Sequence, residues 1–197
     1  MRRCLVLLGL CLVTISSFAK NMPDLVDAGL KAYDQKNYQE ALADFKTAAE
    51  AGDSQAQNNL GAYYLQSPSI KNNYKQAKYW LGKSASQNNK MGIFNLAYLY
   101  INGKSVPKDI NKGIEYYKKS AALNYIDAQR HLGFLYYQGR LVKQNLEQAY
   151  LYFSLAAQNE DTTSANMLPV LSKQMTPIQL KQANNLVKNY KFASTNN

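Results

Sequence analysis

The amino-acid sequence predicts an all-α protein, an α-solenoid in which antiparallel helix pairs stack into a right-handed superhelix. Three observations lead to this prediction. The chain repeats itself with a period of 36 residues, apolar residues follow helical spacing in two stretches of each repeat, and turn residues separate the stretches. One such helix pair cannot bury its apolar face alone, so successive pairs must stack on one another.

The 36-residue period is visible at several kinds of position. A leucine followed by a small residue or proline recurs, and so do single small residues and tyrosines. The equivalent positions are Leu60, Leu96, Leu132 and Leu168, then Ala41, Ala77, Gly113 and Ala149, then Tyr64, Tyr100 and Tyr136. Because the register holds over successive shifts, chance similarity does not explain it, and the repeats are structural units.

Each unit is expected to form two helices. Within 55–66 the apolar residues follow a 3.6-residue stripe, and 74–87 repeats this pattern. In the next unit Gly103 and Pro107 stand between the two helices, where they end one helix before the other begins. The small residues expected to let the paired helices approach closely are Gly61, Ala97 and Gly133.

Two segments of one unit carry a family resemblance. Residues 100–109 and 115–122 resemble the Sel1-like repeat (SLR), a relative of the tetratricopeptide repeat with a longer turn between its helices. Residues 129–157 are similar to the same repeat, 57–87 match it in both helices but lack the turn glycine, and 28–51 look like a plain tetratricopeptide unit. The resemblance implies a solenoid that binds other proteins without catalysis. The SLR proteins of pathogenic bacteria further imply a role in contact with a host cell.

The chain is expected to divide into five parts. Residues 1–19 predict a bacterial signal peptide, because two arginines precede an apolar run and small residues end it at Ala19. An uncleaved anchor is the alternative, and export predicts a periplasmic or secreted protein. The other parts are a tetratricopeptide-like first repeat at 20–54, Sel1-like repeats at 55–165, a C-terminal half-repeat and cap helix at 166–190, and a flexible tail at 191–197.

Residues that carry chemistry are scarce. Both cysteines, Cys4 and Cys11, lie in the expected signal peptide, and the only histidine is His131, so no zinc site is expected. The Ser-x-x-Lys pattern that begins at Ser105 lies in a turn and lacks the partner motifs of penicillin-recognising enzymes. His131 is expected to be a partly buried helix residue. The sequence therefore predicts a protein that is not an enzyme and uses no metal or cofactor.

The charge of the chain is high and unevenly distributed. The formal net charge is +10, yet residues 20–56 carry more acids than lysines, and most basic residues follow. Nucleic acid is not an expected partner, because most tyrosines fall on packing positions of the repeat and the lysines are typical of a solvated helix face. The basic residues either serve solubility or meet an anionic envelope surface. The second case predicts an accessory of cell-wall or membrane enzymes that docks on anionic polymer.

The leading prediction is an adaptor that binds a protein, as a peptide or helix, in a concave groove. In tetratricopeptide-like stacks the first helix of each unit lines this groove, and aromatic or arginine side chains there are typical anchors, worth about 2 kcal/mol or more each. The predicted groove residues are Asn58, Phe94, Tyr98, Ile101, Arg130, Phe134 and Tyr137. The alternative is that these rings complete the core between adjacent helices.

Overall fold

The computed structural model describes residues 22–71 and 73–192, and in this part of the chain it contains ten α-helices and no strand. The helices are α1 (Met22–Asp34), α2 (Tyr38–Glu50), α3 (Ser54–Gln66), α4 (Tyr74–Ser86), α5 (Lys90–Asn102), α6 (Ile110–Ala122), α7 (Ile126–Gln138), α8 (Leu146–Ala157), α9 (Thr162–Gln174) and α10 (Pro177–Asn189). The expected signal peptide at 1–19 lies outside the described residues. Among those residues no helix has the length and hydropathy needed to span a membrane.

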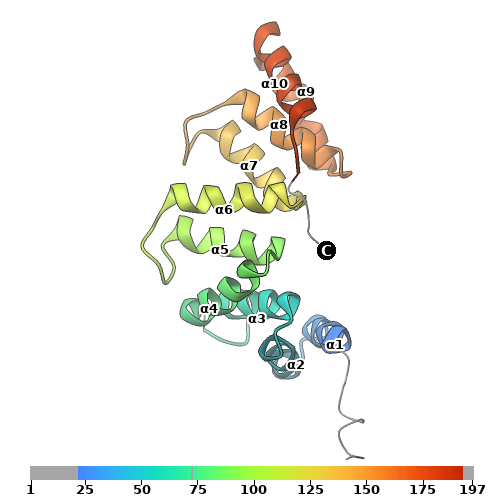
Figure 1. The fold of residues 1–197 in the computed structure, drawn as a ribbon, viewed down its shortest axis with the longest axis vertical. Coiled ribbons are helices and arrows are strands. Elements are labelled where there is room, and N and C mark those ends of the chain that lie inside the picture. The colour runs from blue at the N-terminus through green and yellow to red at the C-terminus, as the bar shows by residue number, and fades with distance from the viewer. Residues whose placement is uncertain (1–21, 72, 193–197) are drawn as a thin grey trace, which may run out of the picture.

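The helices form antiparallel pairs that stack along one axis (Figure 1). The pairs are α1 with α2, α3 with α4, α5 with α6, and α7 with α8, and each even-numbered helix also packs on the first helix of the next pair. The helices predicted at 55–66 and 74–87 are present as α3 and α4. This arrangement confirms the α-solenoid.

Polar residues at the helix starts explain the regular helix boundaries. Asp53 Oδ1 accepts a hydrogen bond from the backbone N of Ala56 at 2.6 Å, and Asp109 Oδ1 accepts one from Lys112 at 2.9 Å. Such caps satisfy backbone N–H groups that have no partner inside the helix. At the opposite end of α5, Gly103 takes a left-handed conformation with φ of 63°, which glycine adopts without steric penalty.

Close helix contact depends on the small residues of the repeat, as predicted. A Cβ atom added to Gly61 would lie 2.6 Å from Leu81 Cγ, and one added to Gly133 would lie 2.6 Å from Phe153 Cδ1. Both distances are far shorter than carbon atoms tolerate, so the absence of a side chain sets the spacing of α3 from α4 and of α7 from α8.

Buried polar side chains repeat with the same period and join neighbouring units. Ser84 Oγ donates to the Ser54 carbonyl oxygen at 2.7 Å, and Ser120 Oγ donates to that of Lys90 at 2.7 Å. Both serines are fully buried. Each buried hydroxyl therefore has an acceptor at the start of an odd-numbered helix, which removes the penalty of an unpaired polar group.

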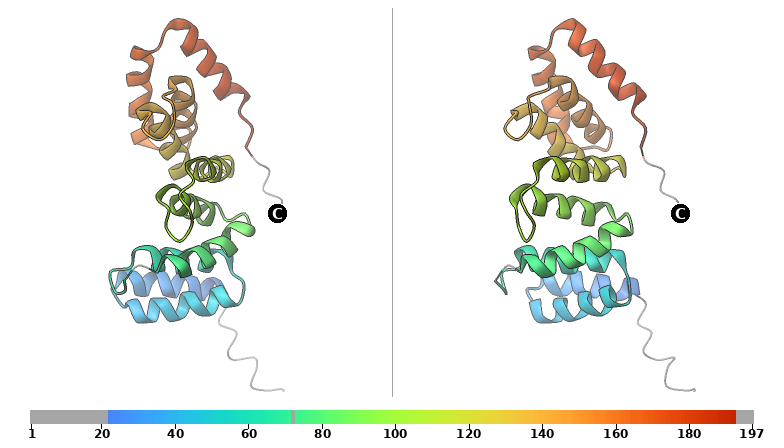
Figure 2. Two further views of the ribbon diagram at one scale, coloured as in Figure 1. Left: turned by 90° about the vertical axis from the view of Figure 1, so that its left-hand side faces the viewer. Right: turned by 60° about the vertical axis from the view of Figure 1, so that its left-hand side comes forward.

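The C-terminal end departs from the regular stack. The helix predicted from Pro177 is present as α10 and begins with a capping box between Thr176 and Gln179. It packs on α8, and Val187 and the C-cap residue Tyr190 pack against the core cluster of α5 to α8. Figure 2 shows α10 running back along the stack. Leu168 of α9 is consequently only partly buried, whereas its equivalent Leu132 is fully buried.

Candidate protein-interaction surface

Side chains of α3, α5, α7 and α9 contact one another in turn and form a continuous surface. Asn58 of α3 is hydrogen-bonded to Asn95 of α5, Phe94 of α5 lies against His131 of α7, and Arg130 of α7 pairs with Asp161 at the start of α9. We call this the odd-helix surface, after the helices that supply it. It contains the positions at which the sequence predicts a groove.

The seven predicted groove residues differ widely in exposure. Asn58 and Ile101 are buried, at 5% and 8% exposure, so the structure places them in the packing and not on an open face. Tyr98 is exposed, at 42%. The residues of intermediate exposure are Phe94, Arg130, Phe134 and Tyr137. Tyr98 is therefore the one aromatic side chain among the seven that is exposed.

Phe94 belongs to an aromatic cluster that joins three helices. Its ring centroid lies 5.0 Å from that of Tyr117, 5.3 Å from that of Tyr125 and 5.8 Å from that of His131. Aromatic pairs at such distances stabilise a fold beyond the area they bury. Tyr117 is almost fully buried, and burial, followed by the proximity of Tyr98, raises its pKa to about 12. Phe94 thus packs on the core cluster of α5 to α8 and keeps part of its surface exposed.

Phe134 and Tyr137 pack toward the C-terminal helices. The ring of Phe134 meets that of Phe153 edge to face at 4.9 Å, and both Phe134 and Tyr137 pack on the cluster that includes Leu171 of α9. Gln174 Nε2 donates to the Tyr137 hydroxyl at 3.4 Å. These two aromatic residues stabilise the end of the stack and keep only part of their surface available.

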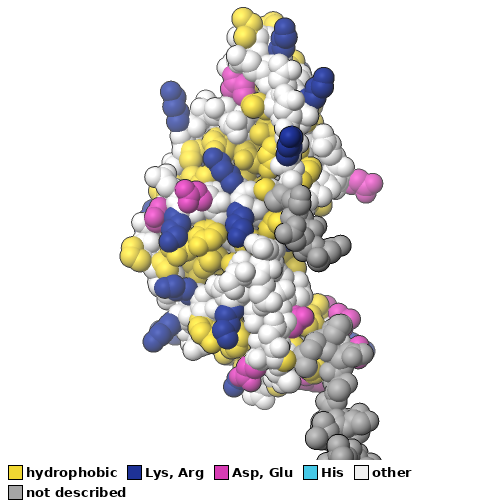
Figure 3. All heavy atoms as spheres, viewed as in Figure 1, with side chains coloured by type: hydrophobic (Ala, Val, Ile, Leu, Met, Phe, Trp, Pro, Cys, Tyr) yellow, Lys and Arg dark blue, Asp and Glu magenta, His cyan; other side chains and the backbone are white. Residues whose placement is uncertain are grey.

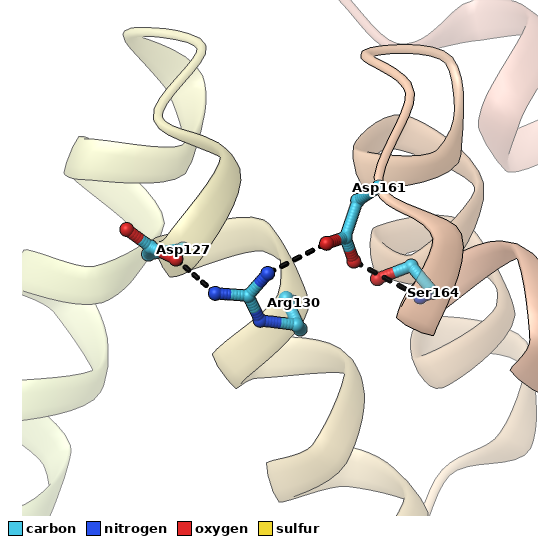
Figure 4. Close-up of polar contacts among 4 residues, drawn as sticks. All are labelled: Asp127, Arg130, Asp161 and Ser164. Atoms are coloured by element: carbon cyan, nitrogen blue, oxygen red, sulfur yellow. Dashed lines mark hydrogen bonds and ion pairs between the residues drawn. The ribbon is translucent and has the colours of Figure 1, made fainter.

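Arg130 is engaged within the protein and bridges α7 to α9 (Figure 4). Its Nη1 donates to Asp161 Oδ1 at 2.6 Å, and its Nη2 pairs with Asp127 of its own helix. Asp161 Oδ2 accepts from the backbone N of Ser164 at 2.9 Å, which caps α9. Burial acts to raise the pKa of the Asp161 carboxyl, but the hydrogen bonds from Ser164 and Arg130 outweigh it and hold the pKa below its ordinary value.

A network of side-chain amides, not predicted from the sequence, crosses from α3 to α5. Asn95 Nδ2 donates to Asn58 Oδ1 at 2.9 Å, and Asn58 Nδ2 donates to Asn59 Oδ1 at 3.2 Å. Gln55 Nε2 donates to the same Asn59 oxygen at 3.2 Å. Asn59 and Asn95 stand 36 residues apart, so their recurrence in the sequence was the signal that could have revealed this network.

His131 occupies the third position of that series and differs from its prediction. The residue is more exposed than predicted, but its ring is covered on one side, with its centroid 4.8 Å from that of Tyr117. The neighbouring rings shield the imidazole from part of the solvent, and this desolvation, with the nearby Arg130 charge, lowers its pKa. Within the described residues no three His, Cys, Asp or Glu side chains gather where they could hold a metal ion.

Three consecutive segments of the chain, 54–89, 91–125 and 126–161, match the family of the Sel1 repeat. The chain belongs to the Sel1 repeat family. The matched segments coincide with the units from α3 to the start of α9, which confirms the predicted resemblance. Sel1 repeats generally mediate protein–protein interactions and typically form non-catalytic scaffolds. No curated protein sequence matches this Sel1 repeat protein.

Solved structures similar to this Sel1 repeat protein share the solenoid fold. A protective antigen of uropathogenic Escherichia coli with an SLR fold is 31% identical, with a TM-score of 0.76 over 88% of this chain, and this chain spans 38% of the antigen. A Sel1 repeat protein of Oxalobacter formigenes is 23% identical, with a TM-score of 0.68 over 86% of this chain and 74% of its own. Cysteine rich protein B of Helicobacter pylori is 26% identical, with a TM-score of 0.51 over 76% of this chain and 99% of its own.

Proposed function

We propose that this Sel1 repeat protein is a non-catalytic scaffold that binds a peptide or helix of another protein on its odd-helix surface. The observation that carries the proposal is Tyr98. Its side chain is 42% exposed, and it follows Phe94 of the aromatic cluster and Asn95 of the amide network by about one helical turn on α5. Large aromatic side chains presented in this way are typical anchors of protein interfaces.

The scaffold is further proposed to act in the bacterial envelope or outside the cell. The basic start and the apolar run within residues 1–19 support export. Sequencing the N-terminus of the protein recovered from the producing cells tests this step. A new N-terminus directly after Ala19 is the expected result, and recovery of the intact N-terminus in the cytoplasmic fraction would contradict it.

The basic surface is a weaker candidate for the interaction. Lysine and arginine side chains are separated by hydrophobic patches on the face shown in Figure 3. Several lysines already lie over aromatic rings, with Lys112 Nζ 4.6 Å from the Tyr100 ring centroid and Lys104 Nζ 4.9 Å from that of Tyr74. Such cation–π contacts engage the ammonium groups within the protein. We therefore assign the partner to the odd-helix surface and not to the lysines.

Affinity capture tests the proposal with two matched variants. Tyr98→Ala removes the exposed ring on α5, and Tyr79→Ala removes a ring of similar exposure, 52%, on α4. The partner is expected to be retained by the wild type and by Tyr79→Ala and lost by Tyr98→Ala. Salt at about 0.5 M separates the two candidate surfaces, because contacts of exposed charges weaken with ionic strength while apolar contacts persist. Equal retention by both variants would rule out the odd-helix surface.

A further inference from the structure

A pocket opens between α1 and α3, at the N-terminal end of the odd-helix surface. Its volume is about 130 Å³, and apolar side chains supply most of its wall. These are Leu30 and Tyr33 of α1, Phe45 of α2, and Ala62 and Tyr63 of α3. Leu30 is 42% exposed at this site, an unusual exposure for a leucine of a helix pair. None of the predicted groove residues lines the pocket.

One polar group in the pocket wall lacks a partner. Asn59 Oδ1 accepts hydrogen bonds from Gln55 Nε2 and Asn58 Nδ2. The Asn59 Nδ2 group is consequently the free end of the amide network, and it is buried without a hydrogen-bond partner. This unmade hydrogen bond costs free energy, and because the nitrogen has almost no accessible surface, a molecule in the pocket does not reach it.

The size of the pocket selects among possible occupants. A buried apolar cavity of roughly 150 Å³ holds a benzene ring in other proteins. A pocket of about 130 Å³ is therefore suited to one aliphatic side chain of the size of leucine or methionine.

The charge around the pocket indicates what flanks this side chain. Asp27 and Asp34 stand three residues before and four residues after Leu30, a spacing that places them on the same face of α1. Both are exposed, and neither forms an ion pair within the part of the chain that the structure describes. Exposed Lys31 lies between them on this face, so the two acids and one base carry a net charge of −1, which favours lysine or arginine in the bound segment.

We infer that the α1–α3 pocket is the anchor site for an extended peptide in which leucine or methionine is flanked by basic residues. The aliphatic side chain enters the pocket, and the basic residues meet Asp27 and Asp34. This inference rests on the proposed function, because it names the peptide that part of the same surface recognises.

A substitution that the repeat itself tolerates can close the pocket. Ala62 is equivalent to Tyr98 one unit later, where a tyrosine is accommodated. Ala62→Tyr is therefore expected to fold and to fill the pocket. The matched control is Ala43→Tyr, the same change at an exposed position of α2 away from the pocket. Circular dichroism and thermal melting establish that both variants are folded before binding is measured.

Two-dimensional ¹H–¹⁵N NMR titrations test the inference with three defined peptides. The sequences are acetyl-Gly-Lys-Leu-Lys-Gly-amide, the same peptide with alanine in place of leucine, and the same peptide with glutamate in place of both lysines. The leucine–lysine peptide is expected to shift the signals of Leu30, Ala62 and the Asn59 side-chain amide in a saturable manner. The alanine peptide should bind about tenfold more weakly or worse, because it buries little apolar surface. The glutamate peptide should also bind more weakly.

The outcomes separate this inference from the proposed function. Loss of the shifts in Ala62→Tyr, with retention in Ala43→Tyr, supports the pocket. Equal binding of the leucine and alanine peptides, or no shift at the pocket at millimolar peptide, overturns it. Because the peptide comparison uses the wild-type protein, its result does not depend on how the variants fold. A pocket that fails here leaves the capture result for Tyr98 standing, and failure of that capture experiment leaves the pocket result standing.

Discussion

The two ends of the solenoid use equivalent repeat positions in opposite ways. Ala62 of α3 and Phe134 of α7 stand two repeats apart at the same position. The small side chain of Ala62 leaves a pocket of about 130 Å³ beside it, whereas the ring of Phe134 packs on Phe153 at 4.9 Å. The helix packing beneath is the same, since Gly61 and Gly133 allow equally close approach. The difference shows that side-chain size on the odd-numbered helices can vary while the stack is preserved.

The two ends of the solenoid also differ in their polar contacts. At the N-terminal end uncharged amides are linked in series and leave one donor free at Asn59. At the C-terminal end Arg130 is bound by carboxylates on both sides, from Asp127 and Asp161. The C-terminal surface therefore uses its polar groups to hold α9 in place, whereas the N-terminal surface leaves one buried amide donor unpaired.

The largest expected effect comes from replacing an aromatic residue with alanine at the repeat position that Tyr98 and Phe134 share. Phe134→Ala should lower the free energy of unfolding by about 2–3 kcal/mol, because it empties space beside Phe153. Tyr98→Ala should cost less than about 1 kcal/mol, since its side chain is exposed. Chemical denaturation of both variants measures the difference. Equal losses would mean that the odd-helix surface is packed alike along its length.

The glycines that set helix spacing provide the next largest effect. Gly61→Ala and Gly133→Ala should each destabilise the protein by about 1–3 kcal/mol, because the added methyl group overlaps Leu81 or Phe153. Gly82 of α4 is the control, since nothing lies within 4 Å of a Cβ added there. Gly82→Ala should instead raise stability by about 0.5–1 kcal/mol through helix propensity. Thermal melting orders the three variants, and losses of different size at Gly61 and Gly133 would show that the two ends are packed differently.

Removal of the arginine bridge should loosen the C-terminal end locally. In Arg130→Ala the Asp161 carboxylate keeps its capping bond to Ser164 but loses its charged partner. Because the Arg130 side chain is 34% exposed, solvent screening limits the expected loss to about 1 kcal/mol. Hydrogen–deuterium exchange should quicken in α9 and remain unchanged in α1 to α4. Faster exchange throughout the chain would contradict a local role.

The smallest expected effect is on the stability of the protein at acidic pH. The Asp161 carboxyl has a lower pKa in the folded protein than its ordinary value of about 3.9, so its contribution to stability is fully present above that pH. The contribution is lost as the pH falls through the folded-state pKa. Asp161→Asn should keep the cap on α9 and lose this part of the acid sensitivity below about pH 4. Parallel melting curves from about pH 3 to about pH 6 measure it, and identical curves for both proteins would refute the assignment.

The fold could be predicted because the repeat period places the same small and apolar residues at each helix contact. The surface could be predicted less well. Ile101 is equivalent to Tyr137, yet Ile101 is buried and Tyr137 is partly exposed, because exposure depends on neighbouring helices that the register does not specify. Arginine is a typical interface anchor, so the sequence favoured a binding role for Arg130. The structure pairs it with Asp161 of the next unit, a contact that the sequence does not show. The α1–α3 pocket is formed by side chains of three helices, and its presence depends on how these helices pack, which the sequence alone does not specify.

Photo-crosslinking in the producing cells tests the central claim most directly. Tyr98 on the odd-helix surface and Tyr79 on α4 are each replaced with p-benzoylphenylalanine, in separate strains. The two tyrosines have similar exposure, 42% and 52%, so access of solvent does not bias the comparison. A discrete protein adduct from position 98 and none from position 79 is the predicted result. Adducts from position 79 alone, or the same adducts from both positions, would contradict a partner-binding odd-helix surface.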